Sequence, residues 1–86
     1  MKFIPDISIQ TLRGCHAIVY YDAGGQHLLE VNEILALLFR RAEAGDFSAE
    51  SLAPVLEEQY GISHGLALEE AAKAIDVWMQ YRLIAP

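Results

Sequence analysis

Residues 16–38, HAIVYYDAGGQHLLEVNEILALL, pass from a strand-forming pattern to a helix-forming pattern. Residues 16–21 are rich in β-branched and aromatic side chains, which favour strands. Asp22-Ala23-Gly24-Gly25 is typical of a tight turn, because glycine adopts positive φ angles at little cost. Residues 26–31 then predict the returning strand of a hairpin. A helix is predicted to begin directly after this second strand.

A third strand is predicted upstream of the hairpin. Residues 7–13 (ISIQTLR) alternate apolar and polar side chains, which is the period of a half-buried strand, and Gly14 ends the pattern. If the three strands pair in chain order, residues 26–31 lie at the edge of the sheet. The first third of the chain therefore predicts a small antiparallel three-stranded sheet with an unpaired edge at Gln26–Val31.

Capping residues mark the first two of three predicted helices. Asn32 is a typical N-cap for the first, which carries an apolar stripe of Ile and Leu. Ser48 is a typical N-cap for the second, which spans residues 49–60, and Gly61 is well placed just past its end. Pro54 removes one hydrogen bond within this helix, so we expect a kink or a start later than Ser48.

The third helix is predicted from about Leu68 to Tyr81, and its apolar arc is wider than a core stripe needs. One face gathers Leu68, Ala72, Ile75 and Met79. The arc is extended by Ala74, Val77, Trp78 and Tyr81. After it, Leu83 and Ile84 form an apolar tail that we expect to pack back on the domain. The sequence thus predicts one α+β domain, residues 1–86, with a winged-helix-like order of a three-stranded sheet followed by three helices.

Charge is spread unevenly along the chain. The 86 residues carry a net charge of −6, and all of this net charge falls in residues 43–86. Nucleic acids and anionic membranes require a basic surface, so the acid excess counts against both as partners. The third helix offers Lys73 against Glu69, Glu70 and Asp76, and would repel a phosphate backbone. A winged-helix nucleic-acid-binding protein is kept as an alternative.

Catalysis and metal binding are not predicted. No pair of Cys and His residues has the spacing of a zinc site, and no nucleophile, base and orienting residue can be assembled. A pair of Cys15 and His27 is conceivable, but nothing in the sequence supplies its third member. We therefore expect no enzymatic activity and no cofactor. A single cysteine, no signal peptide at the start and no apolar run of membrane length predict a cytoplasmic protein without a membrane span.

The remaining interpretation is binding through the sheet edge. An unpaired edge strand accepts an extended peptide by strand addition, and the apolar arc of the third helix would form the other wall of a groove. Trp78 and Tyr81 fit equally well as parts of a thin core or of a dimer contact. An edge strand also pairs with a second copy, so a homodimer is open. A small regulatory subunit that docks on a partner protein is a further alternative.

The order of these parts is similar to that of the PqqD-like family, the peptide chaperones or RiPP recognition elements of ribosomal peptide modification. The likeness runs from about Ile7 to Ile84. It includes the Asn32 cap, the helix ending Glu58-Gln59-Tyr60-Gly61 and the final Tyr81-Arg82-Leu83-Ile84. Gly25-Gln26-His27-Leu28-Leu29 resembles the Gly-x-Thr-His-Leu-Leu element of members found with HPr-kinase-related proteins, although Gln26 replaces Thr and Arg82 replaces a usual Gly.

The resemblance implies a non-catalytic peptide chaperone. Such domains bind the leader of a precursor peptide as an added strand, between the third strand and the third helix. They present it to a modifying enzyme, often a radical-SAM protein, in post-translational modification and cofactor biosynthesis. Carried onto this sequence, the peptide-binding residues are Gln26, His27, Leu28, Leu29, Glu30, Val31, Lys73, Ala74, Val77, Trp78 and Tyr81.

Overall fold

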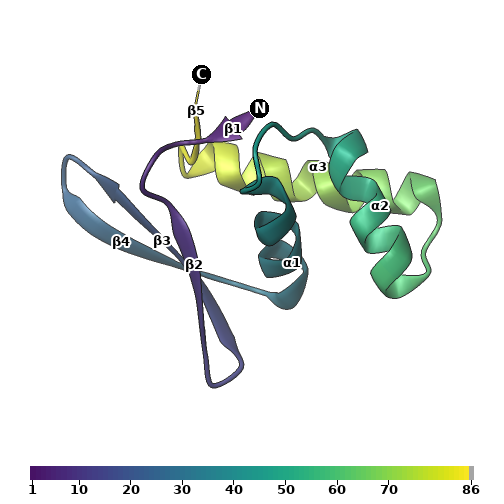
Figure 1. Cartoon of the computed structure of the whole chain (residues 1–86), viewed down its shortest axis with the longest axis horizontal. Coiled ribbons are helices and arrows are strands. Elements are labelled where there is room, and N and C mark those ends of the chain that lie inside the picture. Colours follow the sequence, from purple (N-terminus) through teal and green to yellow (C-terminus); the bar gives the residue numbers. More distant parts are fainter. Residues whose placement is uncertain (86) are drawn as a thin grey trace.

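The computed structural model describes residues 1–85. In chain order its elements are β1 (Lys2–Phe3), β2 (Ser8–Leu12), β3 (Cys15–Asp22), β4 (Gly25–Val31), α1 (Glu33–Ala42), α2 (Ala49–Tyr60), α3 (His64–Gln80) and β5 (Ile84–Ala85). The predicted α+β class is confirmed, because a three-stranded antiparallel sheet precedes three helices. Figure 1 shows the sheet on one side of the molecule and the helices on the other.

The sheet has the order β2-β3-β4, so β3 is central and β4 is an edge strand, as predicted. The β2–β3 turn closes with Leu12 opposite Cys15, and the β3–β4 turn closes with Asp22 opposite Gly25. Arg13 and the glycine after it both adopt positive φ, 53° and 80°, in the first turn. Two successive positive φ angles match the right-handed twist of the strands that such a turn connects.

Side-chain caps fix the starts of α1 and α2. The Asn32 side chain accepts a hydrogen bond from the Leu35 amide at 2.8 Å, so α1 begins as soon as β4 ends. The Ser48 side chain accepts from the Ser51 amide, and Ser51 bonds back to the Ser48 amide. This reciprocal cap starts α2 directly after Ser48, so the later start expected from Pro54 is wrong.

Helix α3 differs from its prediction in both length and orientation. It begins at His64, four residues before the expected Leu68, because the Ser63 side chain caps it by accepting from the Leu66 amide at 3.3 Å. Its core face was predicted only in part, since Ile75 is buried but Ala72 is exposed and Met79 is 53% exposed. The residues that α3 buries are Ala67, Ala71, Ala74, Ile75 and Trp78. This buried face consists of three alanines with Ile75 and Trp78, and it places Trp78 in the core.

An aromatic cluster around Trp78 forms the centre of the core. Trp78 is fully buried and lies edge-to-face against Phe3 at 4.9 Å, Phe47 at 5.6 Å and Phe39 at 6.4 Å between ring centroids. Its indole N–H has no hydrogen-bond acceptor within the described residues. Edge-to-face aromatic pairs are favourable beyond the apolar area they bury, so this cluster stabilises the fold strongly.

The two ends of the described chain lie together. Leu83 is fully buried, which confirms that the apolar tail packs back on the domain. Beyond the prediction, β1 and β5 form a short antiparallel pair, with Phe3 opposite Ile84. The Ile4 amide donates to the Leu83 carbonyl at 2.9 Å next to this pair. The pair ties the start of the chain to the end of α3 and holds Phe3 in the aromatic cluster.

Candidate peptide-binding site

Strand β4 presents one free edge and two different faces. Its partner β3 occupies only one side, and no strand pairs with the other side in residues 1–85. Ile18 of β3 belongs to the core, and the face of the sheet on which it lies also carries His27, Leu29 and Val31 of β4. The opposite face carries Gln26, Leu28 and Glu30. An extended segment added at this edge would therefore alternate between a half-buried face and an exposed face.

An apolar pocket opens where β4 ends. It has a volume of about 230 Å³ and lies between the first turn of α1 and the middle of α3. Its lining residues are Asn32, Ile34, Leu35, Glu70, Lys73, Ala74 and Val77. Asn32 follows Val31 directly, so the pocket begins one residue after β4, although no residue of β4 itself lines it. The free edge of β4 and this pocket together make up the candidate site.

Helix α1 holds the sheet and the pocket together. The Arg40 guanidinium donates to Thr11 Oγ1 at 2.7 Å, which links α1 to β2. Thr11 Oγ1 also lies 2.8 Å from His16 Nδ1 on β3, and His16 pairs with Val31 of β4. These contacts run from the helix across all three strands to the residue before the pocket. They connect α1 to the sheet through β2 and β3.

Charge at the pocket rim is sparse and balanced. Lys73 Nζ lies 3.4 Å from Glu70 Oε1 one turn earlier on α3, and the Lys73 side chain is mostly exposed. An exposed pair of this kind contributes little to stability. Both groups are therefore free to reorient toward a charged or polar group on a bound chain, while the floor of the pocket stays apolar.

The other end of β4 carries a hydrogen-bonded His–Asp pair. His27 Nε2 lies 2.7 Å from Asp22 Oδ1, and the Gly24 amide donates to the same oxygen at 2.7 Å. These hydrogen bonds, with the one from His27 the stronger, lower the pKa of Asp22 below its ordinary value. The His27 ring also stacks on Tyr20 at 5.2 Å between centroids. The hairpin tip is thus stiffened beside the edge strand.

The peptide-binding residues predicted on α3 lie in three different places in the structure. Lys73, Ala74 and Val77 line the pocket. Trp78 lies fully buried in the core, so its inclusion among groove residues is corrected: the indole packs beneath the surface and a peptide does not reach it. Tyr81 caps the C-terminal end of α3, is 43% exposed and lines neither of the two pockets described here.

Sequence reasoning missed the contribution of α1 to the pocket. Asn32, Ile34 and Leu35 line it, yet they were predicted only as a cap and an apolar core stripe. The available signal was the number of large apolar side chains in α1. Ile34 and Leu35 are adjacent, so together with Leu37 and Leu38 they widen the apolar arc of α1 beyond one narrow stripe, and both of them line the pocket.

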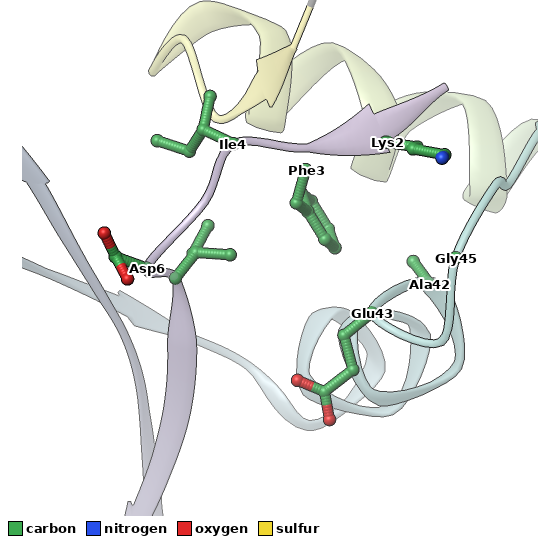
Figure 2. Close-up of a pocket in the computed structure, with 8 residues that line it drawn as sticks. Lys2, Phe3, Ile4, Asp6, Ala42, Glu43 and Gly45 are labelled. Carbon is green, nitrogen blue, oxygen red and sulfur yellow. The ribbon is translucent and has the colours of Figure 1, made fainter.

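A second pocket is lined by no residue of β4 or α3. It has a volume of about 280 Å³ and is lined by Lys2, Phe3, Ile4, Asp6, Ile7, Ala42, Glu43 and Gly45. Figure 2 shows the Phe3 side chain pointing from β1 toward the C-terminal end of α1, with charged side chains around it. None of the predicted site residues lines this pocket, so the pocket beside β4 is the better candidate.

Two candidate chemical sites, a metal site and the conceivable Cys15–His27 pair, are absent from residues 1–85. No group of three or more His, Cys, Asp or Glu side chains in residues 1–85 could hold a metal ion. Cys15 pairs with Leu12, whereas His27 pairs with Tyr20. Five residues along β3 separate these positions by about 16 Å, too far for a nucleophile and its base. No helix in this part of the chain is both long and apolar enough to cross a membrane.

Comparison with known proteins identifies a shared fold. No protein-family model and no curated protein matches the sequence. Among solved structures, the chain is similar to "Lasso peptide synthetase B1 complexed with the leader peptide", with a TM-score of 0.76 and 20% sequence identity. The match covers 99% of this chain and 96% of that chain. At this identity the likeness shows that the two chains have the same fold over nearly their whole lengths.

Proposed function

We propose that this chain is a non-catalytic peptide chaperone of the PqqD-like type. It binds the leader of a ribosomally made precursor peptide as a fourth strand beside β4 and presents that peptide to a modifying enzyme. The observation that supports the proposal is that β4 has a free edge and that the residue after it, Asn32, lines the apolar pocket between α1 and α3. Main-chain hydrogen bonds supply affinity and the pocket supplies side-chain selectivity.

Each part of the site has a distinct role in this proposal. The main chain of Gln26–Val31 pairs with the leader. Ala74 and Val77 receive an apolar leader side chain, and Lys73 meets a carboxylate or carbonyl at the rim. The fold shared with a synthetase component solved with a leader peptide supports the proposal. In this proposal the chemistry falls to a partner enzyme, for which the resemblance implies a radical-SAM protein.

A titration followed by amide chemical shifts tests this function. The probe is a synthetic leader segment of a candidate precursor peptide, and the control is the same peptide with its sequence scrambled. Amides of Gln26–Val31 should shift first and most, followed by those around Val77. Shifts confined to α2 would contradict the groove. A gel shift with duplex DNA that weakens steeply with salt would instead favour nucleic-acid binding.

A further inference from the structure

The free edge of β4 lacks the features that usually keep edge strands apart. Natural edges are blocked by proline, lysine, bulges or short length. Strand β4 has seven residues, contains neither proline nor lysine and carries one charge, at Glu30. Leu28 stands 69% exposed at its centre. Figure 1 shows the β3–β4 hairpin projecting away from the helices, so much of this edge is accessible to another strand.

The sequence of β4 is complementary to itself in one antiparallel register. The register that pairs all seven residues of Gly25–Val31 with a second copy has its two-fold axis at Leu28. It places Leu28 opposite Leu28 of the second copy, on the exposed face of both sheets. On the same face it places Gln26 opposite Glu30 of the second copy, twice by symmetry. No like charges meet, and the amide of Gln26 faces a carboxylate that it can bond.

We infer that two copies of this chain pair antiparallel through β4, with Leu28 at the two-fold axis, and that this pairing and peptide binding exclude each other. The mutual exclusion rests on the proposed function, because both partners would use the same main-chain edge. The pairing of two copies does not depend on the proposed function. Two seven-residue strands form a small interface, so the association is weak and reversible. Self-pairing would cover the edge until a peptide replaces it.

Charge changes at position 26 test the register. Gln26→Lys places a cation opposite Glu30 of the second copy in two equivalent pairs, and dimer affinity should rise roughly fivefold. Gln26→Glu places two carboxylates opposite each other and should weaken the dimer by a similar roughly fivefold factor. The exchange Gln26→Glu with Glu30→Gln restores the complementary pairs and should return affinity to near the original. Gln10→Lys and Gln10→Glu, on the exposed face of β2 at the opposite edge, are the matched controls.

Sedimentation equilibrium of the full chain over a wide concentration range measures each dimer constant. A chain that stays monomeric throughout, or a dimer that responds equally to changes at Gln26 and Gln10, overturns the inference. Adding the leader peptide should convert the dimer to a monomer–peptide complex, and a dimer that keeps its affinity with peptide bound overturns the exclusion. A chain that stays monomeric but binds peptide contradicts the pairing and leaves the proposed function intact. A dimer whose affinity responds to charge at position 26, in a chain that binds no peptide, supports the pairing and contradicts the proposed function.

Discussion

Substitution of Val77 by lysine is expected to separate peptide binding from folding. Val77 is half-buried and lines the pocket beside β4, while the core of α3 is built by Trp78 and the alanines before it. A lysine at this position fills the pocket with a flexible chain and places an ammonium group where an apolar side chain of the leader would lie. The edge of β4 and its main-chain groups stay unchanged.

The size of the effect follows from the pocket. An apolar cavity of about 150 Å³ accommodates a benzene-sized group, so the volume of about 230 Å³ here accepts one large apolar side chain. Burial of such a side chain stabilises a complex by about 1.5–3 kcal/mol. Loss of this contribution corresponds to a Kd higher by roughly 10- to 150-fold. The main-chain bonds to β4 should keep the remaining affinity measurable.

Met79 provides a matched control on the same helix. Its side chain is 53% exposed and lies outside the pocket, so Met79→Lys adds the same charge without filling the pocket. Isothermal titration calorimetry with the leader peptide should give a raised Kd for Val77→Lys and a nearly unchanged Kd for Met79→Lys. Thermal unfolding should show that both variants stay folded. Equal affinities for the two variants would refute the assignment of the pocket to the binding site.

Three further predictions concern the core, the hairpin tip and the first turn. Trp78→Ala should lower the free energy of unfolding by about 3–5 kcal/mol, because it empties the centre of the aromatic cluster. Urea unfolding followed by circular dichroism measures this change. An unchanged unfolding midpoint would place Trp78 outside the core. The Asp22 carboxyl should titrate below its ordinary pKa of 3.8 by NMR, and His27→Ala should raise that pKa. Since the folded-state pKa is the lower one, the stability from this pair is present above about pH 4 and is lost as the pH falls through the lowered pKa; an unmoved Asp22 titration in His27→Ala would contradict the pair. Arg13→Asn should raise stability by about 0.5–1 kcal/mol because asparagine tolerates a φ near 53°, and a lower melting temperature would count against that turn geometry.

Local signals explain which elements could be predicted from sequence. The caps predicted helix α2 at its observed bounds, since Ser48 and Gly61 mark its ends with chemistry that acts within four residues, whereas the later start expected from Pro54 was wrong. The three strands were predicted to within one or two residues, because their alternation and turn residues are equally local. These features need no knowledge of what packs against them.

Tertiary contacts explain the rest. The apolar arc of α3 is so wide that several rotations of the helix would bury an apolar face. The observed rotation of α3 is the one that packs Trp78 against Phe3, Phe39 and Phe47. The β1–β5 pair joins residues at opposite ends of the chain in strands of two residues each, too short to show a period. The contribution of α1 to the pocket could not be predicted either, because apolar residues on a helix fit a core position and a pocket wall equally well.

A division between main chain and side chain follows from this site. Hydrogen bonds along the edge of β4 are the same for every added strand, so they cannot distinguish one peptide, or a second copy of the chain, from another. Under the proposed function, discrimination would come from the apolar pocket, where a second copy offers only its own β4 residues and a leader can offer a large apolar side chain. A leader that fills the pocket therefore gains a contact that self-pairing lacks. That difference, and not the strength of strand pairing, would decide which partner occupies the edge.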